Sequence, residues 1–253
     1  FLFLMHKSSL KERKEFYEKE FNIKKVASWL KKLPYKPQFF VIDSGTETRI
    51  IKDKSKFKKL IFFKPYLTLK ELKKKLIKYM PEDVYYDRNI YKNPYKCLKN
   101  FNFQNAPLSN NYVGQELVFD VDPENITCPG CGKKKFPKFC KICTKLSIEN
   151  GFKICRELKK QFKNVKLVFS GRGCHVHVLD KKAYKLSLRE RSKLNKQFKK
   201  YAIDPWVSYG KVRLIRMPYS LNSLSSRIVT PLKIKEIKNF SLSKKKFLPR
   251  FLK

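Results

Sequence analysis

The sequence predicts an α+β fold, because strand-like and helix-like segments follow one another along its 253 residues. Short stretches rich in Val, Ile and Phe show the two-residue alternation of strands, most clearly ELVFDVD at residues 116–122. Longer stretches between them repeat apolar residues at the spacing of amphipathic helices. Two CxxC pairs near the middle of the chain add a small metal-binding knot to this plan.

The composition is that of a globular protein with a strongly basic surface. Hydrophobic residues make up 42% of the chain and aromatic residues 14%, which argues against a disordered protein. Lys and Arg total 60 against 21 acids, a formal net charge of +39. So large a surplus indicates a polyanionic partner and not only a charge that aids solubility. Nucleic acid is favoured over an anionic membrane as this partner. No apolar run is long enough for a membrane span, and the opening FLFLM is too short for a signal peptide.

The first part of the chain predicts a helix followed by a small group of strands. Residues 9–33 have a helical apolar face, and Ser9 is the expected N-cap. Residues 38–42 and 59–63 predict short strands. Between them, IDSGTETRI at residues 42–50 is expected to turn and return as a third strand.

A second helix and a polar connection lead to the central strand. Thr68 and Glu71 form a capping box for a helix over residues 68–80. VYYDRNIYKNPY at residues 84–95 is rich in Tyr, which indicates either buried core tyrosines or rings that stack on bases. Residues 97–114 are polar and predict a loop.

The central strand carries two acids on one face. Leu117, Phe119 and Val121 alternate with Asp120 and Asp122, so the acids share the face opposite the apolar residues. One interpretation is an edge strand with solvated acids. The other is a platform for divalent metal ions, because magnesium prefers carboxylate oxygens and two metals suit in-line phosphoryl transfer.

The four cysteines of the knot have the spacing of a closed zinc site. Cys128, Cys131, Cys140 and Cys143 form CxxC, eight residues, CxxC, which favours structural zinc over four reduced cysteines that meet by chance. Their abundance also indicates a reducing compartment rather than disulfides. The basic KKKFPK between the pairs is a candidate contact for a backbone phosphate.

The second half of the chain continues the alternation of elements. Helices are predicted over 144–163 and 187–201, and strands over 165–169, 175–179 and 211–218. The tail at 233–253 carries eight basic residues and one acid. It is expected either to wrap nucleic acid or to form a solvated, partly disordered end.

SGRGCHVHV at residues 170–178 forms a glycine-rich turn between two strands. Its glycines allow backbone N–H groups to approach a phosphate, and Arg172 adds a charge-assisted fork. His175 and His177 share one face of the next strand and are either core residues or functional ones. Farther on, Asp204 is either part of a structural ion pair or a third metal ligand.

Together these motifs resemble the small catalytic subunit of archaeal and eukaryotic DNA primase. The resemblance runs from about residue 10 to 232, through VYYDRNIYKNP, LVFDVD, the cysteines, SGRGCHVHV and IDPWVSYGKVRLIRMPYSLNS in that order. It implies a primase catalytic core, with mixed sheets flanked by helices and a zinc knot beside the cleft. A catalytic domain at 1–232, with the knot inserted at about 123–146, and a basic tail at 233–253 are the implied division.

The resemblance also assigns the site residues. Asp120, Asp122 and Asp204 match the family's ligands for two magnesium or manganese ions. The residues matching those that hold the nucleotide's triphosphate are Ser170, Gly171, Arg172, Gly173, His175 and Arg216. Asn222 matches a family histidine that also serves the nucleotide, and Gln38 falls where the family often has an acid. The single Arg172 is similar to the archaeal form of the turn.

The implied activity is template-directed synthesis of short primers by two-metal nucleotidyl transfer. The implied partners are a large regulatory subunit in a heterodimer, a single-stranded DNA template and nucleoside triphosphates, in an archaeal cytoplasm or, in a eukaryote, the nucleus. One alternative is a repair or plasmid-type primase-polymerase that acts without the large subunit. The other is a non-catalytic, zinc-stabilised nucleic-acid-binding protein, which Gly210 and Asn222 keep open because relatives often carry Asp and His there.

Overall fold

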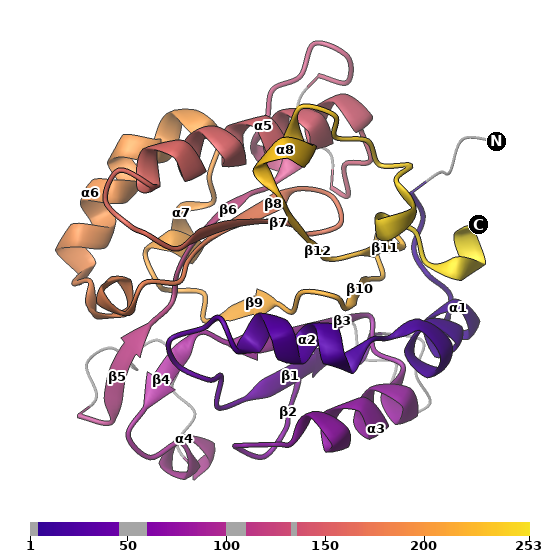
Figure 1. The fold of residues 1–253 in the computed structure, drawn as a ribbon, viewed down its shortest axis with the longest axis horizontal. Coiled ribbons are helices and arrows are strands. Elements are labelled where there is room, and N and C mark those ends of the chain that lie inside the picture. The colour runs from indigo at the N-terminus through magenta and orange to yellow at the C-terminus, as the bar shows by residue number, and fades with distance from the viewer. Residues whose placement is uncertain (1–4, 46–59, 100–109, 133–135) are drawn as a thin grey trace.

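Two four-stranded sheets form the framework of the protein (Figure 1). The structure, a computed structural model, describes residues 5–45, 60–99, 110–132 and 136–253. The strand order in the first sheet is β2 (Leu60–Phe62), β1 (Phe40–Asp43), β3 (Asp83–Asp87) and β9 (Leu214–Arg216). The order in the second is β12 (Thr230–Leu232), β7 (Val165–Phe169), β8 (Cys174–Val178) and β6 (Leu117–Val121).

The described strand pairings are all antiparallel, whereas mixed sheets were expected. The α+β class itself is confirmed. Two short ribbons complete the strands: β4 (Asn89–Tyr91) pairs with β5 (Tyr112–Gln115), and β10 (Leu221–Asn222) pairs with β11 (Arg227–Ile228). Within the described ranges, no helix has the length and apolar character needed to cross a bilayer.

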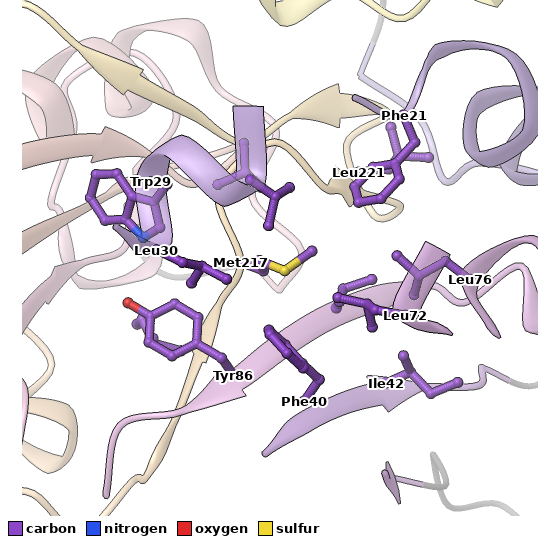
Figure 2. Packing of buried hydrophobic residues seen from close by; sticks show 14 of the residues in the cluster. Phe21, Trp29, Leu30, Phe40, Ile42, Leu72, Leu76, Tyr86, Met217 and Leu221 are labelled. Carbon is purple, nitrogen blue, oxygen red and sulfur yellow. The ribbon is translucent and has the colours of Figure 1, made fainter. Parts of the chain in front are cut away.

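One hydrophobic core joins the two sheets. Val118 of the second sheet belongs to the same buried cluster as Phe40 and Tyr86 of the first. Helix α2 (Ile23–Leu30) adds Trp29 and Leu30 to this cluster, and Figure 2 shows them facing Tyr86 and Phe40. Burial of these large side chains supplies the hydrophobic stabilisation that holds the sheets together.

A second core lies on the other face of the second sheet. Leu117, Phe119 and Val121 project into it, as the alternation in the sequence predicted. Helices α5 (Lys141–Leu158) and α6 (Leu188–Phe198) cover this face (Figure 1). Helix α5 was predicted over 144–163; it begins earlier, with Cys140 as its N-cap, and ends earlier, with Lys159 as its C-cap.

The first predicted helix is interrupted. Residues 9–33 form α1 (Leu10–Glu15), a π-helical segment at Phe16–Glu20 and then α2, so the expectation of one helix is corrected. Phe21 leaves the helical region with φ −58° and ψ 112°, and Asn22 caps α2 through its side chain. The predicted caps at Ser9 and Thr68 are confirmed, the latter for α3 (Leu69–Tyr79).

The remaining elements are short. They are α4 (Tyr95–Lys99), α7 (Pro205–Ser208), α8 (Ile234–Ile237) and 3-10 turns at Pro123–Asn125, Lys181–Lys185, Lys199–Tyr201, Lys245–Phe247 and Arg250–Leu252. The stretch predicted as a loop at 97–114 thus contains parts of α4 and β5. The predicted third strand in IDSGTETRI extends into residues 46–59, which lie outside the described residues.

The basic tail packs on the second sheet. The buried ring of Phe247 lies 4.9 Å from that of Phe169 on β7, measured between ring centroids. Ile237 of α8 joins the same core. The tail is therefore not the solvated end that was one of its two expected forms, and the domain division at residue 232 stays a prediction.

Candidate active site

The three acids predicted as metal ligands meet beside the outer edge of the second sheet. Asp120 is on β6, Asp122 follows that strand, and Asp204 is the N-cap of α7, which lies beside β6 (Figure 1). The backbone N–H of Asp204 donates to the carbonyl of Asp120 at 2.8 Å. The carboxylate of Asp204 in turn accepts the N–H of Trp206 at 2.9 Å. The backbone therefore fixes the acids relative to one another.

Asp120 is largely shielded from solvent, although β6 is an edge strand. Only 14% of the Asp120 side chain is exposed. Burial, together with Asp122 and Asp204, raises the pKa of Asp120 well above its usual value, while Arg216 and Arg172 act in the opposite direction. Burial likewise raises the pKa of Asp122. The two arginines do not fully offset the unfavourable free energy of ionising these buried carboxylates. An added positive charge at the site would therefore stabilise their ionised form.

The fit of this site to a divalent cation rests on the side chain of Asp120. Its Oδ1 atom is buried and has no hydrogen-bond partner among the described residues. A hard cation would satisfy such an oxygen. Among the described residues, only the cysteines form a group of at least three ligand atoms that all lie within 4.8 Å. The carboxylate oxygens of the three acids are thus more widely spaced than this limit.

The two histidines of SGRGCHVHV have different surroundings. His175 pairs with Asp120 in the β6–β8 register, and its Nε2 atom lies 3.6 Å from Asp120 Oδ1, beyond hydrogen-bond distance. Burial and the neighbouring His177 lower the pKa of His175 well below its usual value, so its ring is neutral at pH 7. His177 instead lies in the core, with Nδ1 2.8 Å from Glu116 and its ring against Trp29. Only His175 is at the site.

Close packing explains why both Gly171 and Gly173 of the turn lack a side chain. Gly171 has φ +109°, and a Cβ atom there would lie 2.5 Å from the side chain of Asn222. A Cβ atom on Gly173 would lie 2.3 Å from the carbonyl of Val121. The N–H of Ser170 donates to the carbonyl of Gly173 at 3.0 Å and closes the turn. The turn is therefore held directly against the end of the strand that carries the acids.

Arg172, at the tip of the turn, is held from two sides. Its guanidinium pairs with the carboxylate of Glu124, in the 3-10 turn that follows Asp122. It also lies against the ring of Phe136, whose centroid is 5.5 Å from the guanidinium carbon. Phe136 belongs to the loop between the two cysteine pairs, so the knot reaches the turn.

Arg216 reaches the acids from the first sheet. On β9 it pairs with Asp83 of β3, and its guanidinium lies 5.6 Å from the ring of Tyr85. Burial alone would lower the pKa of Arg216, but Asp83 and Tyr85 outweigh it and raise the pKa. The electrostatic influence of Arg216 on both Asp120 and Asp122 places it near the carboxylates.

Asn222 supports the turn with its amide. Its Nδ2 donates to the carbonyl of Ser170 at 2.8 Å, and its Oδ1 accepts the N–H of Ser225 at 3.3 Å. Gln38 makes a similar use of its amide, since it accepts the N–H of Tyr91 at 2.8 Å and donates to the carbonyl of the same residue at 2.7 Å. A carboxylate has no N–H and could not make the second bond, which accounts for an amide at this position.

The four predicted zinc ligands converge. The Sγ atoms of Cys128 and Cys140 are 3.9 Å apart, and those of Cys131 and Cys143 are 3.4 Å apart. Tetrahedral zinc with Zn–S bonds of about 2.3 Å requires sulfur atoms about 3.8 Å apart, so the cysteines fit the ion. The ammonium of Lys138 donates to the carbonyl of Ile126 at 2.9 Å and holds the loop.

Sequence reasoning missed two acids of the site. Glu124 pairs with Arg172 and Asp83 pairs with Arg216. Acids are scarce in this chain, 21 against 60 basic residues, and Glu124 follows the DxD pattern by two positions. That scarcity was a usable signal for Glu124. Nothing in the sequence connects Asp83 to Arg216, since strand pairing alone brings them together.

Comparison with known proteins finds relatives across the whole chain. No protein-family model matches it. A protein of Archaeoglobus fulgidus, described as an uncharacterised DNA primase small subunit-like protein, is 37% identical over 258 residues that cover 98% of this chain and 92% of the relative. The DNA primase small subunit PriS of Pyrobaculum calidifontis is 30% identical over 60% of this chain and 47% of its own length. The subunit of Thermococcus sibiricus is 28% identical over 76% and 49%. This chain thus spans about half the length of these two PriS proteins.

A solved structure shares the fold and adds to this result. The polymerase domain of Mycobacterium tuberculosis ligase D, solved in complex with DNA, matches with a TM-score of 0.53 and 12% identity over 92% of this chain and 83% of that one. At this identity the likeness concerns the fold alone. The sequence identity to the Archaeoglobus protein extends over nearly the full length of both chains, and the chain therefore belongs to the DNA primase small-subunit family.

Proposed function

We propose that this protein is the catalytic subunit of a DNA primase, which synthesises short primers on a single-stranded template by nucleotidyl transfer. The observation that carries the proposal is the meeting of Asp120, Asp122 and Asp204 at one buried edge, with Arg172 and Arg216 close by. The family names of the archaeal relatives support it.

Each residue has a separate task in this proposal. The three carboxylates would hold two magnesium or manganese ions, whose chemistry would be to activate the primer's 3′-hydroxyl and to stabilise the leaving pyrophosphate. Arg172 and Arg216 neutralise the triphosphate, whose charge would otherwise be repelled by the acids. The neutral ring of His175 is suited to donate a hydrogen bond to a phosphate oxygen. Ser170, Gly171 and Gly173 shape the turn, and Asn222 supports it from behind.

The four cysteines would hold a structural zinc ion. All four thiolates would be used, so the ion has no open position for chemistry. The partners proposed are nucleoside triphosphates, a single-stranded DNA template and a large regulatory subunit, since the PriS relatives are named small subunits.

Nucleotide incorporation on a single-stranded template tests the proposal. The wild type is compared with a variant that combines Asp120→Asn and Asp122→Asn, each with and without a pre-annealed primer. Glu18→Gln is the matched control, because it removes an exposed carboxylate elsewhere in the chain. We expect product from the wild type and the control, and at least about a thousandfold less from the double variant. The double variant should retain zinc and its thermal midpoint.

Primer dependence separates the proposed primase from a second candidate. The second candidate is a primer-extending polymerase that acts without a large subunit, and the fold shared with the polymerase domain of ligase D is compatible with it. Product without a primer identifies a primase. Product only with a primer, even after a large subunit is added, identifies the extender. Template binding without incorporation under any condition would overturn both.

A further inference from the structure

An exposed tryptophan follows directly on the acid site. The chain has two tryptophans, Trp29 and Trp206. Trp29 is buried, with 1% of its surface exposed, whereas Trp206 on α7 is 56% exposed. Trp206 is two residues beyond Asp204. A side chain of this size and apolar character is usually buried at least in part, and an exposed one beside a site indicates a surface that another molecule covers.

The backbone of Trp206 is fixed on both sides. Its N–H donates to the Asp204 carboxylate at 2.9 Å. Its carbonyl accepts the N–H groups of Lys211 and Val212 at 3.1 and 3.2 Å. Gly210, with φ +89°, completes this turn and leaves no room for a Cβ atom, which would lie 2.5 Å from the side chain of Gln115. The indole is therefore presented on a rigid segment whose position is tied to the third acid.

A positive charge accompanies the ring. The ammonium of Lys211 lies 4.4 Å from the centroid of the Trp206 ring, a cation–π contact. An aromatic face beside a lysine combines the two features that bind single-stranded nucleic acid, a stacking surface for bases and a charge for the backbone. The net charge of +39 makes a polyanion the complementary partner.

We propose that Trp206 and Lys211 form a base-stacking platform for a single-stranded nucleic acid strand that enters the acid site. One base would stack on the exposed indole, and Lys211 would contact a neighbouring phosphate. The identity of the strand as template or primer rests on the proposed function. The stacking itself does not, because it needs neither metal nor nucleotide.

Tryptophan fluorescence tests stacking directly, since the buried Trp29 serves as an internal reference. A single-stranded oligonucleotide, titrated without metal or triphosphate, should quench the emission of the wild type. Trp206→Phe leaves Trp29 as the only emitter, and we expect its emission to stay unchanged. Quenching that persists in Trp206→Phe, or an unquenched wild type that binds the oligonucleotide, would overturn the platform.

Affinity measurements separate the base from the backbone. By fluorescence polarisation with a labelled oligonucleotide, Trp206→Ala should weaken binding about 5- to 100-fold, and Trp206→Phe less than about threefold. The loss in Trp206→Ala should disappear when the oligonucleotide is abasic. Lys211→Gln should reduce the slope of log affinity against log salt by about 0.7. Tyr66→Ala, which removes an equally exposed ring outside the Tyr-rich stretch, should bind like the wild type.

The outcomes distinguish this platform from the proposed function. Equal binding by Trp206→Ala and the wild type would overturn the platform, whether or not the enzyme is active. Quenching in a protein that incorporates no nucleotide would retain the platform and reject the primase activity. Should Trp206→Ala fold poorly, the quenching of the wild type and its loss in Trp206→Phe still decide the question.

Discussion

The carboxylate of Glu124 pairs with the guanidinium of Arg172, and both side chains are largely buried. The same Glu124 oxygen accepts the backbone N–H of Lys138 at 3.2 Å, from the loop between the cysteine pairs. The arginine proposed for the triphosphate is therefore already neutralised by an acid in the free protein. A triphosphate bound at Arg172 would therefore compete with Glu124 for this guanidinium.

Glu124→Gln removes that competitor while it keeps a hydrogen-bond acceptor. We expect the nucleotide KM to fall about 3- to 10-fold, with kcat changed less, because only the competition for Arg172 is relieved. The measurement is incorporation on a primed template at varied nucleotide concentration, with Glu18→Gln alongside as the surface control. A higher KM in Glu124→Gln would mean that the ion pair orients Arg172 instead of competing for it.

Replacing one cysteine of the zinc knot should lower both the stability of the protein and its nucleotide affinity at the Arg172 turn. In Cys140→Ser we expect zinc to be lost and the thermal midpoint to fall by roughly 5–15 °C, because the metal site contributes to folding. Since Phe136 of this loop covers Arg172, nucleotide affinity should fall as well. Metal analysis and thermal unfolding measure the first two effects. Cys97→Ser, at a cysteine outside the cluster, should retain both zinc and midpoint.

Gly151, in the middle of α5, allows the helix to approach the second sheet closely. A Cβ atom there would lie 2.3 Å from the sulfur of Cys174 and 2.8 Å from Leu167. Gly151→Ala should therefore destabilise the protein by about 1–3 kcal/mol, although alanine is the better helix former. Denaturant unfolding measures the change, and Cys174→Ala in the same chain should recover part of it. A more stable Gly151→Ala would show that the helix can shift outward without cost.

Asn222→Asp replaces a donor with a charge of the wrong sign for the Ser170 carbonyl. The lost bond and the new repulsion should displace the turn, so the nucleotide KM should rise about tenfold. Steady-state kinetics on a primed template measure it. The exposed Asn239→Asp introduces the same charge and should have no effect. An unchanged KM in Asn222→Asp would show that the turn keeps its position without this amide.

Local signals predicted the elements of the second sheet well. VKLVF at 165–169 is β7 to the residue, and the alternation in ELVFDVD assigned its faces correctly. The helix at 9–33 failed because apolar spacing persists through Phe21, while the backbone turns there to bury that ring. The periodicity of hydrophobic residues does not reveal such a break, because the helices before and after it face the same core.

The sequence predicted those site residues whose type and spacing within one motif already indicate a chemical role. The acids, the cysteines and Arg172 stand out by residue type and spacing. The partners that hold them do not: Asp83 meets Arg216 through strand pairing across more than a hundred residues. His175 and His177 share one face of the same strand, so the sequence does not distinguish them. The packing of His177 against Trp29 in the structure assigns it to the core.

The bond between the Asp204 N–H and the Asp120 carbonyl has a practical consequence for engineering. It joins main-chain atoms, so exchanging either side chain leaves the spacing of the two positions intact. Softer ligands such as His or Cys, introduced at either place, would therefore test the metal preference of the proposed site without moving its backbone.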